Sequence, residues 1–198
     1  YKEIKLYKQA IYMFNKALRI YPDSVFYRLE LIDLLIDDKK YDEAFYLIHE
    51  FNSKNDKCAS IYNSMTRIYY RLKQYDNALN SINRCIELDS NNPESFYFKG
   101  LILNDKQEFE QAKTPIYNAI KTSPDNAKYY AQMARSYQGT KQFDDALLYV
   151  KEAIELNQNE INYKKLAFDI ATSIGDETKI AVYKKILERS EKILKGTR

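Results

Sequence analysis

Apolar residues recur along the chain at helical spacing, and the pattern itself repeats every 34 residues. In each repeat an aromatic ring is followed three residues later by an alanine. The five aromatic–alanine pairs are Tyr7–Ala10, Tyr41–Ala44, Tyr75–Ala78, Phe109–Ala112 and Phe143–Ala146. A fixed period of about 20–50 residues indicates a solenoid, in which each unit buries its apolar face only against its neighbours. The pattern therefore predicts one continuous array of repeats with no linker inside it.

Each repeat divides into two helices. In residues 59–92, two mainly apolar sets at helical spacing, the first at i, i+3, i+4 and i+7 and the second at i, i+3, i+7, i+10 and i+11, predict a first helix over about 59–71 and a second over about 75–89. The first set is Tyr62, Met65, Thr66 and Tyr69, and the second is Tyr75, Ala78, Ile82, Cys85 and Ile86. Ser24, Asn92 and Asn126 lie where they can cap the first helices of their units. The chain is therefore predicted to be all-α.

The same register sets the unit boundaries. The chain begins with a partial unit, continues through four full units, and ends in a degenerate unit with a capping helix. These ranges are 1–22, then 25–58, 59–92, 93–126 and 127–160, and finally 161–198. In the last range we expect a first helix over 161–173, ended by Gly175, and a longer second helix over 177–195. An atypical last unit is expected because its outer helix meets water.

Small residues indicate that the two helices of a unit cross closely. The repeated alanine of the second helix faces Thr66, Gly100 and Ala134 on first helices. The unit 25–58 departs from this rule, because bulky Ile32 stands in the small column and Arg28 replaces an aromatic ring. We expect its helix pair to be splayed. Pro115 predicts a second irregularity, either a bend or a helix that begins near Lys113.

With these columns the chain resembles the tetratricopeptide repeat (TPR) family over nearly its whole length. The residues that carry the resemblance are Tyr62, Thr66, Tyr69, Tyr75, Ala78, Ile82 and Cys85 in one unit, Phe96, Gly100, Phe109, Ala112, Ile116, Ala119 and Pro124 in the next, and Tyr130, Ala134, Tyr137, Phe143, Ala146, Val150 and Ala153 in the third. The resemblance implies a right-handed superhelical solenoid of antiparallel helix pairs, with about five units plus partial or capping helices. It also implies a concave surface, lined by the first helices, that binds a peptide or protein.

Composition offers little material for catalysis. The chain has one histidine, His49, and its two cysteines, Cys58 and Cys85, lack the spacing of a metal site or a disulfide pair. It also lacks a phosphate-binding glycine loop. We therefore expect no catalytic residues, no cofactor and no metal, and packing roles for both cysteines. No apolar run approaches the roughly 20 residues of a membrane helix, so we expect no direct membrane insertion.

The resemblance places a set of polar and aromatic residues on the concave face. These candidate partner-binding residues are Asn63, Arg67, Tyr70, Arg71, Tyr97, Asn104, Lys128, Arg135 and Gln138. Arginine can grip a carboxylate with two hydrogen bonds, and aromatic rings are frequent binding anchors. We therefore expect an acidic peptide to bind around Arg67, Arg71 and Arg135, with Tyr97 as the apolar anchor. The Lys/Asn clamp that family members use for chaperone tails is missing, because the matching pairs are Leu29–Asp33, Asn63–Arg67 and Ala131–Arg135.

Three hypotheses about function follow. The favoured one is a protein-interaction scaffold, and the alternative is the repeat arm of a larger enzyme or secretion machine whose active part lies outside this sequence. RNA binding is the least favoured, because residues 1–160 carry a charge near −1 out of the total of +3. We expect a protein or peptide partner and no nucleic acid, and leave self-association open. The compartment is also left open, with a cytoplasmic default and a cell-envelope location still compatible.

Overall fold

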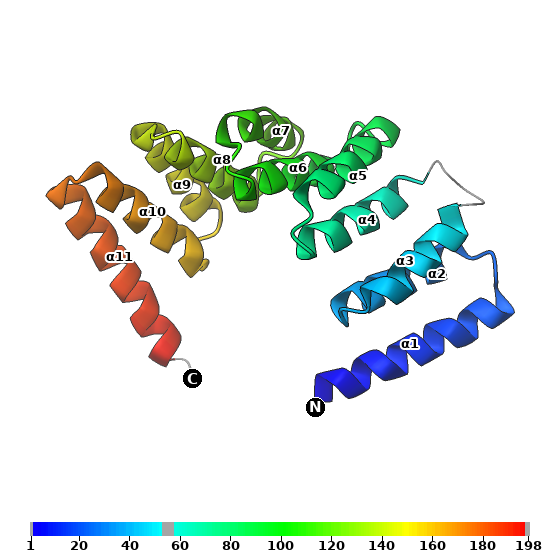
Figure 1. The fold of residues 1–198 in the computed structure, drawn as a ribbon. Helices are drawn as coiled ribbons and strands as arrows, with labels where there is room; N and C mark the ends of the chain where they lie inside the picture. The colour runs from blue at the N-terminus through cyan, green and yellow to red at the C-terminus, as the bar shows by residue number, and fades with distance from the viewer. Residues whose placement is uncertain (1, 53–57, 197–198) are drawn as a thin grey trace. The chain divides into compact units, whose positions relative to one another are not determined.

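The chain folds into helices joined by short turns. The computed structural model describes residues 2–52 and 58–196, which contain eleven helices and no strand (Figure 1). The helices are α1 (Lys2–Ile20), α2 (Val25–Asp37), α3 (Tyr41–Asn52), α4 (Ala59–Arg71), α5 (Tyr75–Leu88), α6 (Pro93–Asp105), α7 (Phe109–Thr122), α8 (Ala127–Gly139), α9 (Phe143–Leu156), α10 (Ile161–Ile174) and α11 (Glu177–Gly196). The predicted all-α class is confirmed, and the predicted helix ends agree to within one residue where they were given.

The helices form two compact units, residues 1–90 and 91–198. In the first, α2 pairs with α3 and α4 with α5. In the second, the pairs are α6–α7, α8–α9 and α10–α11. The predicted caps are present: Ser24 accepts a hydrogen bond from the backbone N–H of Tyr27, and Asn92 and Asn126 accept theirs from Glu94 and Lys128. Residues 53–57, between α3 and α4, lie outside the described residues.

The close crossing of paired helices is the main packing feature. Ala44, Ala78, Ala112 and Ala146 are fully buried, as are Thr66 and Ala134 in the facing column. Gly100 is buried on α6, and a Cβ atom there would lie 2.3 Å from Cγ1 of Ile116 on α7. That distance is far below van der Waals contact, so the backbone of α6 approaches α7 more closely than any side chain allows.

The turn inside each pair repeats as strictly as the alanines. One residue in each turn adopts left-handed backbone geometry, with φ between 59° and 79°: Lys39, Lys73, Gln107, Lys141 and Gly175. These five positions are 34 residues apart. At Lys73 the turn closes with two backbone hydrogen bonds, from Lys73 N–H to Tyr70 C=O and from Gln74 N–H to Tyr69 C=O, both 2.9 Å long. This is the Schellman ending of a helix, in which the left-handed residue is usually glycine.

The α2–α3 pair differs from the other pairs, as expected from its sequence. Ile32 is fully buried, and close backbone approaches are sparser here than in α4–α5, α6–α7 or α8–α9. Arg28 is buried as well. Its guanidinium donates to the carbonyl of Pro22 at 2.7 Å and lies over the Phe51 ring, 5.5 Å from its centroid. The arginine stem and the ring together fill the place of the missing aromatic residue.

Pro115 does not shift the start of its helix. The helix α7 runs continuously from Phe109, with Pro115 inside it, so the alternative start near Lys113 is wrong. The first turn is held by a 3.1 Å hydrogen bond from the N–H of Ala112 to the C=O of Glu108. Ala112 is fully buried in the crossing with α6, and this packing fixes the first turn of α7 ahead of the proline.

We predict that Ala78→Leu destabilises the α4–α5 pair. Ala78 has no exposed surface, and adding volume to a close-packed crossing typically costs about 1–3 kcal/mol. The measurement is the free energy of unfolding from urea denaturation. Asn80→Leu, at an exposed position of the same helix, is the control and should change stability little. Equal stability of Ala78→Leu and the control would show that this crossing is not tight.

We also predict that Lys73→Gly stabilises the protein. A left-handed conformation costs an L-residue roughly 1–2 kcal/mol, and glycine avoids that cost while losing roughly 0.5–1 kcal/mol in chain entropy. The expected net gain is therefore about 0.5–1 kcal/mol, measured by urea denaturation. Lys73→Ala keeps the unfavourable φ and should show no such gain. A glycine variant less stable than the alanine variant would contradict the account of the turn.

Candidate functional site

The predicted binding residues lie on the first helix of each pair, and each compact unit carries its own part of the set. In the first unit they come from α4, which packs beside α2. In the second unit they come from α6 and α8, which also pack side by side. Residues 34 apart occupy matching positions on neighbouring first helices, so Asp33 on α2 matches Arg67 on α4 and Asp37 matches Arg71.

In the first unit, both predicted arginines are already paired with carboxylates. Arg67 forms an ion pair with Asp33, and its second terminal nitrogen lies 3.5 Å from Oδ1 of Asp37. Arg71 donates to the same Oδ1 at 3.0 Å. Two guanidinium groups and two carboxylates therefore form a closed cluster, the α2–α4 ion cluster, with no net charge.

Burial and the charge of Arg67 shift the pKa of Asp33 in opposite directions. Burial, the largest influence, raises the pKa of Asp33, while the positive charge of Arg67 lowers it and the nearby Asp37 raises it further. The side chain of Arg67 is only 26% exposed. An incoming carboxylate would have to displace Asp33 or Asp37, or share the guanidinium against their repulsion. The α2–α4 ion cluster is therefore a poor receptor for an acidic peptide.

The other two predicted residues of α4 take part in packing. Asn63 and Tyr70 are both half-buried. The Tyr70 ring lies against Tyr75, with 6.2 Å between ring centroids. Tyr70 therefore contributes contact area at the end of α4, close to the turn that begins α5.

In the second unit, Tyr97 is held in a tyrosine pair. Its ring lies 5.2 Å from the ring of Tyr129 on α8, between centroids. Tyr129 is buried and donates its hydroxyl proton to Glu94 at 2.8 Å. Burial raises the pKa of Tyr97, and Glu94 raises it further while Arg135 lowers it. Tyr97 is half-buried, so it presents an aromatic surface on a fixed support.

Asn104 is not a surface group, which departs from its expected place in the groove. It is 6% exposed and its side chain joins α6 to α8. Its amide nitrogen donates to the backbone carbonyl and the side-chain oxygen of Gln132, at 3.0 and 3.1 Å. Its oxygen accepts from the hydroxyl of Ser136 at 2.8 Å. A buried amide needs such partners, so Asn104 holds the helices together and offers nothing to a ligand.

The remaining predicted residues lie on α8 and carry unpaired charge. Lys128 and Arg135 are exposed, and Gln138 is half-buried. Neither Lys128 nor Arg135 forms an ion pair with any residue that the structure describes. Asp169 of α10 stands in the position that matches Arg135, as Asp33 does for Arg67, but no ion pair joins them. We call the surface formed by Tyr97, Lys128, Arg135 and Gln138 the α6–α8 face.

The side chains associated with chemistry are few and separated. His49 is exposed, Cys58 is half-buried and Cys85 is buried, and neither cysteine forms a disulfide bond with a residue that the structure describes. Over residues 2–52 and 58–196 no group of histidine, cysteine or acidic side chains is arranged to hold a metal ion. Within the same ranges, every helix is too short or too polar to cross a membrane.

Sequence reasoning missed the partners of the predicted arginines. Asp33 and Asp37 lie one repeat before Arg67 and Arg71, so the 34-residue register contained the signal. The register also placed Asn104 correctly on α6. Its burial depends on Gln132 and Ser136 of the next first helix, and no spacing rule links them.

Comparisons with known proteins agree with this architecture. The family model of the tetratricopeptide repeat matches residues 59–92 and 127–160. The human protein O-mannosyl-transferase TMTC1 (Homo sapiens) is 23% identical over 154 residues, which is 76% of this chain and 18% of that protein. Among solved structures, MamA from Desulfovibrio magneticus RS-1 superposes with a TM-score of 0.77 at 19% identity, over 85% of this chain and 97% of that one. YrrB, a TPR protein with an unusual peptide-binding site, gives a TM-score of 0.73 at 14% identity, over 89% and 91%.

The structural neighbours establish the fold, since their sequences are distant from this one. The curated relatives are much longer proteins. This chain spans 10–30% of the length of four curated relatives that it matches.

We predict that Asp33→Asn changes how stability depends on pH. A carboxyl whose folded pKa is raised destabilises the fold when ionised, and this cost disappears as pH falls through the raised pKa towards the ordinary value of 3.8. The wild type should therefore gain stability relative to Asp33→Asn between pH 7 and pH 3.5. The measurement is urea denaturation of both proteins at the two pH values.

The control for that comparison is Asp125→Asn, at an exposed aspartate in the turn before α8. If the attraction of Arg67 outweighed burial instead, the wild type would lose stability relative to Asp33→Asn on acidification. That result would contradict the conclusion that burial outweighs the charge of Arg67 in setting the pKa of Asp33.

Proposed function

We propose that this chain, whose residues 59–92 and 127–160 match the tetratricopeptide repeat model, is a scaffold for protein–protein interaction that binds an acidic peptide segment of another protein on the α6–α8 face. The observation that carries this proposal is the free positive charge of Arg135 next to the supported ring of Tyr97. The sequence predicts a binding surface that spans three repeats. The site proposed here lies within the second compact unit alone, residues 91–198.

The chemistry of the α6–α8 face fits such a segment. Arg135 has all its guanidinium donors available for a carboxylate, and Lys128 adds a second exposed cation on the same helix. Tyr97 contributes aromatic contact area, and its ring loses little entropy on binding because Tyr129 already holds it. Gln138 adds an amide that can bond the peptide backbone. YrrB, which has a similar fold, is a TPR protein with an unusual peptide-binding site.

The α2–α4 ion cluster takes a different role in this proposal. Because Arg67 and Arg71 are neutralised by Asp33 and Asp37, this surface repels neither acids nor bases strongly. It would tolerate a bound chain without selecting its charge. Selectivity for acidic segments therefore depends on Arg135 and Lys128.

A second candidate function is the repeat arm of a larger enzyme or assembly. It is favoured by the relatives, which extend far beyond the length of this chain. One of them is named an O-mannosyl-transferase, and the match covers 18% of it. In this case the same α6–α8 face would bind a substrate or a subunit. The catalytic residues would belong to another part of the larger enzyme. Sequencing the complete reading frame distinguishes an arm from a free-standing adaptor.

We predict that Arg135→Glu abolishes partner capture while the fold remains intact. The partner is isolated from the native organism with the full chain as bait, and its affinity is then measured by titration. Removing one side of a desolvated charge pair typically costs about 2–5 kcal/mol, so the affinity should fall by well over tenfold. Tyr97→Ala should also weaken binding, and melting curves of both variants check the fold.

The matched control is Arg84→Glu, since Arg84 is an exposed arginine on the second helix α5 and bonds only nearby groups such as Glu87. It should leave the affinity unchanged. Equal affinity of the wild type and Arg135→Glu for the captured partner would show that the α6–α8 face is not the acidic-peptide site.

A further inference from the structure

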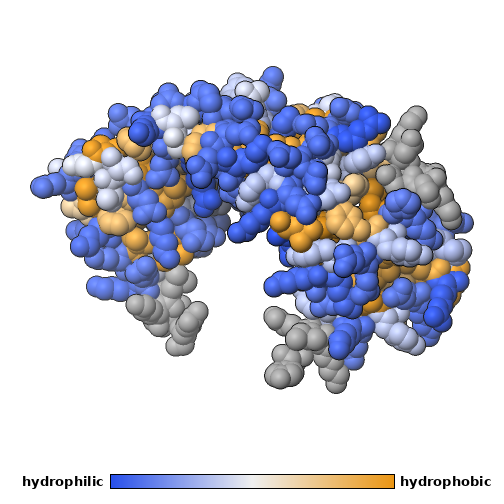
Figure 2. All heavy atoms as spheres, viewed as in Figure 1, coloured by the Kyte–Doolittle hydropathy of each residue, from blue (hydrophilic) through white to orange (hydrophobic). Residues whose placement is uncertain are grey.

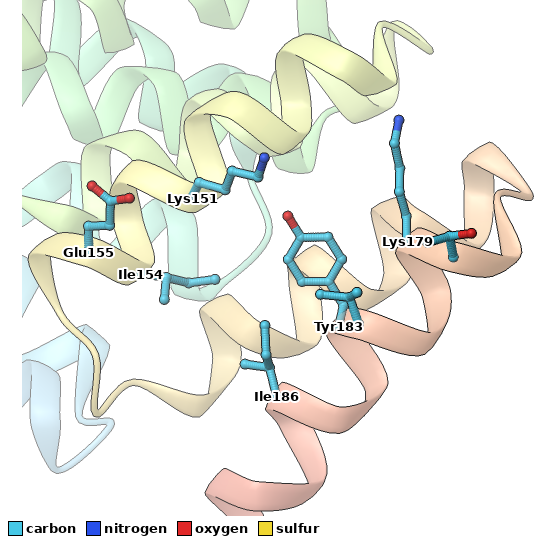
Figure 3. A pocket seen from close by; sticks show the side chains of 8 residues that line it. Lys151, Ile154, Glu155, Lys179, Tyr183 and Ile186 are labelled. Atoms are coloured by element: carbon cyan, nitrogen blue, oxygen red, sulfur yellow. The ribbon is translucent and has the colours of Figure 1, made fainter.

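A largely apolar groove lies between α9 and α11, on a different surface from the α6–α8 face. Its volume is about 430 Å³, which is in the size range of ligand sites. In Figure 3, Lys151, Ile154 and Glu155 of α9 line one wall, and Lys179, Tyr183 and Ile186 of α11 line the other. Thr178 and Val182 complete the lining. We call this site the α9–α11 groove.

Two substitutions in the last repeat distinguish this groove from the corresponding place in the preceding repeat. In the preceding repeat Tyr149 stacks on Tyr137, with 5.2 Å between centroids and 12° between planes. Tyr183 occupies the position that matches Tyr149, but the residue that matches Tyr137 is Ala171. Tyr183 therefore lacks the ring against which its counterpart stacks. At the same time Ile186 replaces the charged residue Glu152 of the preceding repeat, so the wall becomes apolar.

Tyr183 brings a hydroxyl group to this groove. The residue is 7% exposed, and its hydroxyl, which forms no hydrogen bond within residues 2–52 and 58–196, is not sealed from solvent. Figure 3 shows its ring extending from α11 into the space between the two helices. Burial raises the pKa of Tyr183, which keeps the hydroxyl protonated as a donor. The hydroxyl is therefore available to donate a hydrogen bond to an acceptor on a ligand that enters the groove.

The groove also has an uneven charge. Lys151 is exposed and forms no ion pair within residues 2–52 and 58–196, whereas Lys179 is 3.2 Å from Asp144. Beyond the groove, Lys185 and Arg189 follow Val182 at i+3 and i+7, so they continue its edge along α11. Glu155 is the single acid in the lining. The electrostatic preference is therefore for an anion near Lys151.

Exposed aliphatic residues widen the apolar surface at this site. Val182 in the lining is 51% exposed, and Leu148, one turn before Lys151 on α9, is 57% exposed. Figure 2 shows apolar surface among hydrophilic residues over the region of α9 to α11. Burying such side chains against a partner is favourable in proportion to the area removed from water.

We propose that the α9–α11 groove is a second docking site, which takes a short segment of a partner protein that carries a large apolar side chain next to a carboxylate. The apolar side chain packs on Ile154, Val182 and Ile186. The carboxylate pairs with Lys151 and accepts the hydrogen bond of the Tyr183 hydroxyl. The site uses none of the residues of the α6–α8 face, so the two can be occupied and tested separately.

The test selects peptides from a displayed 12-residue library on the full wild-type chain. Selected peptides are synthesised with a fluorescent label, and their affinities are measured by anisotropy. We expect enriched peptides to combine an aliphatic or aromatic residue with Asp or Glu. Ile186→Glu, which restores the residue type of the preceding repeat, should weaken them at least tenfold. Lys151→Glu should also weaken them severalfold, and Tyr183→Phe, which removes only the hydroxyl, should do so as well.

Two controls separate this site from others. Tyr117→Glu, at an exposed aromatic of α7 outside the groove, should leave affinity unchanged, and so should Arg135→Glu on the α6–α8 face. Circular dichroism checks that each variant folds. Selected peptides that bind Ile186→Glu as tightly as the wild type, or that lack acidic residues, would overturn the proposal. A concentration-dependent dimer that Ile186→Glu dissolves would also overturn it, since a second copy would then be the occupant.

Discussion

The close crossing of the two helices in each pair is the constraint on which the rest of the structure depends. A fully buried alanine on the second helix meets a small residue on the first, and at Gly100 even one extra carbon atom would collide with Ile116. The left-handed turn residue, such as Lys73, reverses the chain within the few residues that this crossing permits. Together these two features restrict residue choice in every repeat. The exposed positions of the first helices are freer to differ, and the proposed binding residues Lys128 and Arg135 lie among them.

The contacts between neighbouring first helices differ between the two compact units. In the first, Asp33 and Asp37 neutralise Arg67 and Arg71, so the first helices hold one another through charge. In the second, Asn104, Gln132 and Ser136 join α6 to α8 through a buried polar network, and Arg135 remains unpaired. The hydrogen bonds of this network hold α6 against α8, so the positive charge of Arg135 is not needed for an ion pair between the two helices. An arginine without an ion-pair partner is therefore present on α8 of the second unit, whereas Arg67 and Arg71 of the first unit are both paired.

The fold could be predicted from the sequence almost completely, because it depends on periodicity. The alanine column predicted the helix pairs, and Ile32 and Arg28 indicated that the α2–α3 pair differs from α4–α5, α6–α7 and α8–α9.

The candidate site was harder to predict. The face of a helix indicates which residues share a surface, and it does not indicate whether Arg67 meets an aspartate on the next helix or whether Asn104 is covered. Those outcomes depend on side-chain packing between helices. The same holds for the α9–α11 groove, where Tyr183 lacks a stacking ring because Ala171 occupies the position that matches Tyr137.

Hydrogen–deuterium exchange of the full chain, with and without its captured partner, tests the central claim most directly. The proposed acidic segment on the α6–α8 face should slow exchange in residues 93–105 and 127–139, with little change in 25–37 and 59–71. This pattern should vanish when the partner's acidic residues are replaced by amides. Protection confined to 25–37 and 59–71, or protection that is indifferent to the partner's charge, would contradict the assignment of binding to the free cations of α8.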